Sequence, residues 1–180
     1  MDNQPQSLSE QLGVWREKKN ALHEKLKSTL QNYSHPPDQP TSYFSYSMQL
    51  TIEGDESFII GNYTIYNNSP VTLNDPYICL KLSDDHPFYL SGKIIPKDQR
   101  KNSQITGGWK RMNEDDHPTE YWLSPMNTAK IEPFQRLSLQ HFQLKWDSDT
   151  RFRGSMTGYT YSKEIPDGKL AINQIAIQCQ

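Results

Sequence analysis

The sequence predicts a mainly β protein, an antiparallel β-sandwich preceded by one N-terminal amphipathic α-helix. Apolar residues recur at helical spacing up to about residue 33, and after residue 41 the apolar period changes to two. From there, short alternating segments are separated by polar turns, with no helical pattern between them. We therefore expect a helical arm over residues 1–34, a Pro-rich linker over 35–41 and a sandwich domain over 42–180. A closed barrel is the structural alternative.

The helical arm has a capping box at its start, with Ser7 and Glu10 placed to satisfy each other's backbone amides. Apolar residues then recur at steps of three and four, which predicts a narrow coiled-coil-like seam interrupted by Lys19. This seam can lie on the following domain, pair with a second copy of the chain, or dock on another protein. The residues that would carry the docking are Leu8, Leu12, Trp15, Leu22 and Leu26.

The linker ends the helix because each of its prolines lacks an amide donor and pushes the preceding residue into an extended conformation. In the first predicted strand, residues 43–52, Phe44, Tyr46, Met48, Leu50 and Ile52 share one face. A turn at residues 53–56 makes this strand the first half of an antiparallel hairpin. The other predicted strands are 57–66, 72–73, 77–82, 88–95, 105–112, 120–123, 136–146, 152–161 and 170–179.

Two predicted strands lose their alternation midway. In 136–146 the apolar positions change face near Gln140 and His141, which a β-bulge would repair. In 170–179 the same slip occurs near Asn173 and Gln174.

Part of the chain resembles a known family. Residues 61–69 and 73–82 form a strand, an Asn-rich turn and a second strand, similar to the opening of the immunoglobulin-like sandwich domains of the CARDB and related adhesion-type families. Residues 131–139 resemble the proline turn that precedes a long later strand in those domains. The resemblance implies an immunoglobulin-like sandwich that serves as a binding or spacer module without catalysis.

Composition limits the partners. With 19 Lys and Arg against 21 Asp and Glu, the formal charge is −2, which excludes the dense positive field of a general duplex-binding protein, so a nucleic-acid partner is not expected. No apolar run approaches the roughly 18 residues of a membrane span, and the first residues lack the profile of a secretion signal. We expect a cytoplasmic protein without a membrane partner. Cys79 and Cys179 are expected to be free thiols in ordinary packing.

A tetrapeptide, Asp-Asp-His-Pro, occurs twice, at residues 84–87 and 115–118. If strands 88–95 and 105–112 pair as antiparallel neighbours, both turns fall at the same end of the sandwich. Carboxylates and imidazoles could then hold a divalent metal, with Asp85, His86, Asp116 and His117 as candidate ligands. The alternative is that Asp and Pro only form turns, with no cofactor at all.

Aromatic residues are the second candidate for a ligand site. Trp109, Trp122, Tyr89, Tyr121, Tyr159 and Tyr161 lie in predicted strands, where an exposed flat array could stack on sugar rings or unpaired bases. Filling of the core is their ordinary use. We expect Trp122 and Trp146 inside the core, which leaves Trp109 as the exposed candidate.

The function that the sequence predicts is that of a non-enzymatic intracellular interaction or adaptor protein, whose sandwich binds a partner and whose helical arm docks or dimerises. No catalytic residue is assigned, because no nucleophile motif accompanies the histidines. A metal-dependent or ligand-binding protein that uses the two Asp-Asp-His-Pro turns is the first alternative. A structural subunit of a coat or virion-like assembly is the second.

Overall fold

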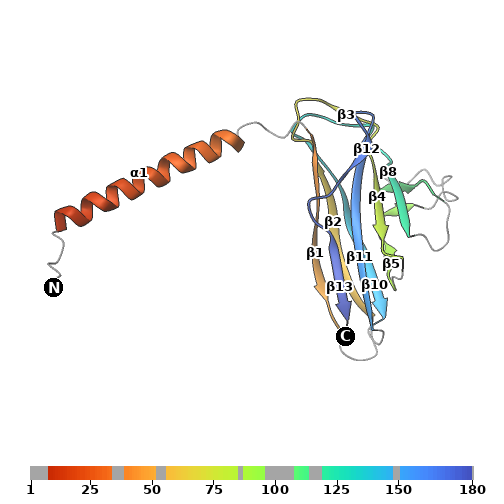
Figure 1. The fold of residues 1–180 in the computed structure, drawn as a ribbon. Coiled ribbons are helices and arrows are strands. Elements are labelled where there is room, and N and C mark those ends of the chain that lie inside the picture. The colour runs from red at the N-terminus through yellow and green to blue at the C-terminus, as the bar shows by residue number, and fades with distance from the viewer. Residues whose placement is uncertain are drawn as a thin grey trace. The chain divides into compact units, whose positions relative to one another are not determined.

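The computed structural model describes residues 8–33, 39–51, 56–84, 87–95, 108–113, 119–147 and 151–179. The chain divides into two compact units, Met1–Asp38 and Gln39–Gln180. The first contains one helix, α1 (Leu8–Tyr33), and the second contains the strands (Figure 1). The predicted class, a mainly β protein with one N-terminal helix, is confirmed.

The strands of the second unit form two large sheets and one small sheet. The order is β1-β2-β10-β5 in the first sheet and β12-β11-β4-β8-β7-β6 in the second, where β13 also pairs with β11. β3 and β9 form the small sheet. The strands are β1 (Thr41–Gln49), β2 (Glu56–Tyr66), β3 (Leu73–Asn74), β4 (Tyr77–Leu82), β5 (Tyr89–Ser91), β6 (Ile94–Ile95), β7 (Trp109–Arg111), β8 (Glu120–Pro125), β9 (Lys130–Ile131), β10 (Arg136–Asp147), β11 (Phe152–Ser162), β12 (Ile165–Leu170) and β13 (Ile175–Cys179).

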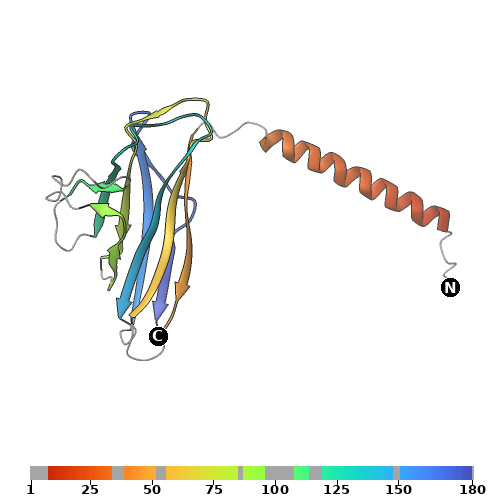
Figure 2. The ribbon, with the colours of Figure 1, turned by 180° about the vertical axis from the view of Figure 1, so that it is seen from behind.

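One hydrophobic core lies between the two large sheets. β2 of the first sheet contributes Ile59, Tyr63 and Ile65, and β4 of the second contributes Ile78 and Leu80, all of them fully buried. These residues alternate along their strands with residues that face outward, as the period of two requires. Figure 1 shows β1 and β2 on one side of this domain and β4 and β8 on the other, and Figure 2 shows the same layers from behind. The two sheets therefore enclose the core as the layers of a sandwich.

The bulge predicted in β10 is confirmed. The register of β10 against β2 shifts between Leu139 and Phe142, and His141 inside this step has a positive φ of 54°. The backbone amide of His141 donates a hydrogen bond to the side-chain carbonyl oxygen of Asn62 at 2.9 Å. Since the extra residues rotate the strand, Leu139 and Phe142 both point into the core, as does Trp146 further along.

The strand predicted over residues 88–95 is instead two strands in different sheets. β5 pairs with β10, whereas β6 pairs with β7 in parallel, so the predicted antiparallel neighbourhood of 88–95 and 105–112 is wrong. The predicted slip in 170–179 is a break between β12 and β13. β9 has no counterpart in the prediction, and of β12 only Leu170 falls within a predicted strand. β12 contains a proline and a glycine, which masked its strand character.

The outer edge of β1 is closed over its first half by the segment between β12 and β13. The Ile172 amide donates to the Ser42 carbonyl oxygen at 2.8 Å. The Asn173 side chain then accepts from the Phe44 amide at 2.8 Å and donates to the Phe44 carbonyl oxygen at 2.9 Å. Asn173 therefore takes the place of a neighbouring strand residue at Phe44. The chain leaves the second sheet between β12 and β13, where Asn173 makes these hydrogen bonds.

Among the described residues of the apolar face predicted for 44–52, only Phe44 enters the core. Phe44 is buried, but Tyr46, Met48 and Leu50 are exposed, and Ile52 lies outside the described residues. Tyr46, Met48 and Leu50 are exposed because β1 is the edge strand of its sheet and has a strand neighbour on one side only.

Candidate functional site

Two apolar residues of the predicted seam have described side chains, and both are exposed on the helical arm. Trp15 is 73% exposed and Leu22, seven residues later, is 63% exposed. A separation of seven residues places both on one helix face. Val14 beside them is also exposed. The side chains of Leu8, Leu12 and Leu26 lie outside the described residues, although α1 begins at Leu8 as the capping box predicts.

Trp109 does not form an exposed ligand platform, so that prediction is wrong. Its side chain is only 4% exposed and belongs to the hydrophobic core, and its indole N–H donates to the Ser138 carbonyl oxygen at 3.4 Å. The cause is its register, since Trp109 pairs with Pro125 and shares the inward face with Leu123. Trp146 is buried as expected, whereas Trp122 is half-buried on the outer face of the second sheet.

The aromatic residues that do gather on an outer face are Tyr77, Trp122 and Tyr161, on β4, β8 and β11. The rings of Tyr77 and Tyr161 are stacked, with centroids 4.9 Å apart and an interplanar angle of 5°. The Trp122 ring lies 5.3 Å from that of Tyr161, and the backbone at Gly168 packs against the Tyr161 ring. Because Tyr77 and Tyr161 stack on each other and the Trp122 ring is tilted by 38–41° to both, the three rings form a packed cluster and not a flat surface for stacking a sugar ring or base.

Cys79 lies beneath this aromatic cluster. Its strand position pairs with Trp122 on one side and Tyr159 on the other, which puts its thiol on the outer face, yet the residue is buried. Burial raises the pKa of the Cys79 thiol to about 12, and the charge of nearby Glu120 acts in the same direction. The thiol is free of a disulfide. A thiol held in its neutral form is poorly suited to act as a nucleophile, which agrees with the packing role predicted for Cys79.

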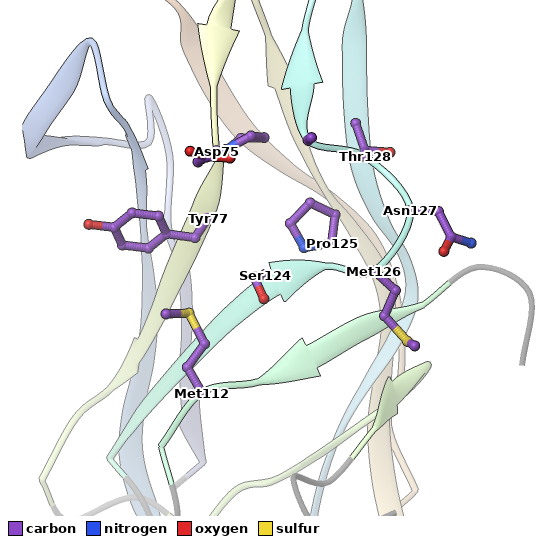
Figure 3. Close-up of a pocket in the computed structure, with 10 residues that line it drawn as sticks. Asp75, Tyr77, Met112, Ser124, Pro125, Met126, Asn127 and Thr128 are labelled. Atoms are coloured by element: carbon purple, nitrogen blue, oxygen red, sulfur yellow. The ribbon is translucent and has the colours of Figure 1, made fainter. Parts of the chain in front are cut away.

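A depression of about 560 Å³ opens beside the aromatic cluster (Figure 3). Tyr77 lies on its wall, Met112 reaches toward Tyr77, and Ser124 and Pro125 of β8 form its base. Asp75 contributes a carboxylate at its rim.

The Asp75 carboxylate at this rim is neutralised by a lysine. Its Oδ2 atom lies 2.7 Å from the Nζ atom of Lys163, and its backbone amide donates to the Ala129 carbonyl oxygen at 2.7 Å. Asp75 adopts a positive φ of 49° in this turn. Sequence reasoning missed this depression because its walls come from three separate segments, 75–77, Met112 and 124–129, and in each of them the residues indicate only a turn or a strand.

Asp85, His86, Asp116 and His117 lie outside the described residues. The described residues just before the first tetrapeptide and just after the second nevertheless lie side by side. The Leu82 amide donates to the Thr119 carbonyl oxygen at 2.7 Å, which joins the end of β4 to the start of β8. The antiparallel β4–β8 pair brings together the segment before the first tetrapeptide and the segment after the second, while the predicted convergence of the two turns remains a prediction. Within the described part of the chain, no group of three or more His, Cys, Asp or Glu side chains is arranged to hold a metal ion.

Among the described residues, no helix is both long and apolar enough to cross a membrane. No protein-family model matches the chain, and no curated protein matches its sequence.

Proposed function

We propose that this chain is a non-enzymatic intracellular interaction protein, in which the sandwich is a binding module and α1 is a docking or dimerisation arm. The observation that carries the proposal is the exposure of Trp15 and Leu22 on one face of α1, in a unit of its own. Apolar side chains on a polar helix gain free energy when a second surface covers them. An immunoglobulin-like character of the sandwich, with a spacer or binding role, belongs to the same proposal.

The arm is tested by removing residues 1–38 from the full chain and by the single substitution Trp15→Ala. If the arm dimerises, light scattering shows a lower oligomeric state after either change. If it docks on a partner, Trp15→Ala weakens that complex by about 3 kcal/mol when the ring is fully covered. Asn20→Ala, an exposed position of the same helix, is the matched control and leaves binding and mass unchanged. Native mass spectrometry distinguishes a small oligomer from a coat-like assembly.

A result in which deletion of the arm changes neither oligomeric state, nor partner binding, nor the stability of the remaining domain would rule out the proposed role of α1. The stability measurement matters because the seam can also lie on the chain's own domain. In that case deletion lowers the free energy of unfolding without changing the mass of the assembly.

A second candidate function is binding of a divalent metal by Asp85, His86, Asp116 and His117. The hydrogen bond between Leu82 and Thr119 favours it, because these two residues flank the two tetrapeptides. Calorimetric titration of the full chain with zinc, manganese and calcium tests this. Binding heat that disappears in the double variant His86→Ala and His117→Ala supports the metal site, and absence of heat with all three ions refutes it.

A further inference from the structure

The charged residues of α1 are distributed unevenly around its apolar stripe. With Trp15 and Leu22 at heptad position d, Lys19 falls at position a of the same stripe. Arg16 and Lys18 fall at positions e and g, which border the stripe on either side. All of these side chains are exposed. The face of the helix that meets a partner is therefore apolar in its centre and basic along both borders.

The next heptad repeats this arrangement. His23 occupies position e and Lys25 position g, so the basic borders continue. The acidic residues of the helix are on the other side, since Glu10, Glu17 and Glu24 all fall at position f, opposite the stripe. Apart from Lys27, which is at position b and pairs with Glu24, the basic residues therefore follow the stripe and the acidic residues the opposite face, which a merely solvated helix does not require.

This segregation disfavours a second copy of the chain as the occupant of the stripe. In a parallel pair, position g of one helix faces position e of the next heptad in the other, so Lys18 of one copy would meet His23 of the other. In an antiparallel pair, g faces g and e faces e, so neither arrangement offers a carboxylate to Arg16, Lys18 or Lys25. A parallel pair also brings two Lys19 side chains together in the seam. Like charges at such positions destabilise the pair.

The narrowness of the stripe disfavours a lipid surface. The seam uses two positions in seven and is interrupted by Lys19, whereas a helix that lies in a membrane interface buries a broad apolar face. A two-in-seven stripe is typical of pairing between helices. Charge complementarity then defines the partner helix, which needs carboxylates at its own e and g positions and one acidic residue that faces Lys19.

We propose that α1 pairs with an acidic amphipathic helix of another protein and not with itself. This inference rests on the proposed docking function and names the chemistry of the partner. Carboxylates along the borders of the partner helix would pair with Arg16 and Lys18, while its apolar stripe would cover Trp15 and Leu22. Such pairs select the partner and its orientation.

The probe is a fluorescein-labelled designed peptide of four heptads. It carries Leu at positions a and d, one Glu in place of the Leu that faces Lys19, and Glu at positions e and g. A matched peptide carries Lys at e and g. Fluorescence anisotropy measures binding of each peptide to the full chain, and sedimentation velocity measures the mass of the chain alone. Lys18→Glu changes a border residue, and Lys27→Glu makes the same change of charge outside the borders, where Lys27 forms an exposed ion pair with Glu24.

We expect the chain alone to be monomeric, to bind the acidic peptide and to ignore the basic one. Lys18→Glu should weaken this binding about fivefold, as expected when one attractive pair becomes repulsive, and Lys27→Glu should leave it unchanged. Three results would overturn the inference. They are a concentration-dependent dimer that Trp15→Ala abolishes, equal affinity for both peptides, and binding to phosphatidylserine vesicles without binding to the acidic peptide.

The same experiment distinguishes the inference from the proposed function. Preference for the basic peptide, or a Trp15-dependent dimer, removes the acidic partner but keeps α1 as a docking arm. A chain that binds neither peptide nor vesicles, and whose oligomeric state and stability do not change when residues 1–38 are removed, overturns both.

Discussion

The Tyr63 hydroxyl, from the first sheet, lies 2.9 Å from the Thr160 hydroxyl of the second sheet inside the core. It also donates to the Ser42 hydroxyl at 2.8 Å. All three residues are buried, so these hydroxyls satisfy one another in the absence of bulk water. Burial, the largest cause, raises the pKa of Tyr63 to about 12, against the opposing effect of its hydrogen bonds with Ser42 and Thr160.

Substitution of Tyr63 by Phe should therefore destabilise the domain. The ring would keep its packing, but Ser42 and Thr160 would lose a buried hydrogen-bond partner, at a cost of about 1–3 kcal/mol. Urea unfolding followed by tryptophan fluorescence measures this free energy. Tyr159→Phe, on the outer face, is the control and should leave the midpoint unchanged. An unchanged midpoint in Tyr63→Phe as well would show that the three hydroxyls do not stabilise the contact between the sheets.

Gly158 lies directly opposite the same tyrosine and should not tolerate a side chain. A Cβ atom there would lie 2.3 Å from Cε2 of Tyr63 and 3.0 Å from Cζ of Phe44, both buried rings that cannot move aside. We expect Gly158→Ala to lower the free energy of unfolding by about 2–3 kcal/mol through overpacking. Gly13→Ala is the control, because Gly13 has no neighbour within 4 Å. It should raise the helicity of α1 in circular dichroism by improving helix propensity. Equal stability of Gly158→Ala and the natural chain would contradict this close packing.

Local patterns were enough to predict much of the fold. The alternation of residues 77–82 predicted β4 with its observed ends, and the change of phase at Gln140 and His141 predicted the bulge in β10. Both depend on neighbours in the sequence. Long-range pairing was predicted poorly. Residues 88–95 divide between the two sheets, and their second half, β6, pairs with β7 in parallel. No periodicity within that segment indicates the division or the direction of the pairing.

The candidate sites show the same division between local and long-range information. The spacing of Trp15 and Leu22 predicted their shared face, since a helix fixes that geometry locally. Whether Trp109 is buried depends on its pairing with Pro125, and its sequence neighbours do not indicate that pairing. The depression beside Tyr77 is likewise built from segments that only the tertiary fold brings together.

The two cysteines should differ strongly in reactivity. At pH 8, a thiol with a pKa of about 12, as in Cys79, has about a thousandfold less thiolate than a thiol at its ordinary value of 9.0. Cys79 is also buried, whereas Cys179 is only partly buried. We expect Ellman's reagent to label one thiol in the native chain and two in urea. Cys179→Ser should leave only the slow thiol, and Cys79→Ser only the fast one. Rapid labelling of native Cys179→Ser would show that the aromatic cluster does not cover Cys79.

The pH dependence of Cys79 has a definite sign. Its pKa in the folded chain is raised above the unfolded value, so the neutral thiol favours folding below about pH 9, and this stability is lost as the pH rises from 9 toward 12. The natural chain should lose stability over this range more steeply than Cys79→Ala. Urea unfolding at pH 8 and pH 10.5 measures the difference. Identical slopes in the two chains would contradict the raised pKa.

Glu164 should make the domain sensitive to acid. Partial burial, the largest effect, raises the pKa of its carboxyl. The carboxylate accepts hydrogen bonds from the side chain and backbone amide of Asn74, from its own backbone amide and from the Ser162 hydroxyl. Together these hydrogen bonds outweigh the effect of burial and hold the pKa at about 2. The folded pKa is thus below its ordinary value of 4.5, so the contribution to stability is complete above that pH and is lost as the pH falls from 4.5 toward 2. Because Glu164 is exposed and screened by solvent, we expect about 1 kcal/mol from these hydrogen bonds, less than the pKa difference alone implies.

Glu164→Gln should lower stability at pH 6 by that amount and have little effect at pH 2.5. Asp167→Asn, an exposed carboxylate in the adjoining strand β12, is the control and should change stability at neither pH. A loss in Glu164→Gln that is equal at both pH values would show that the carboxylate charge does not hold β3 to the turn between β11 and β12.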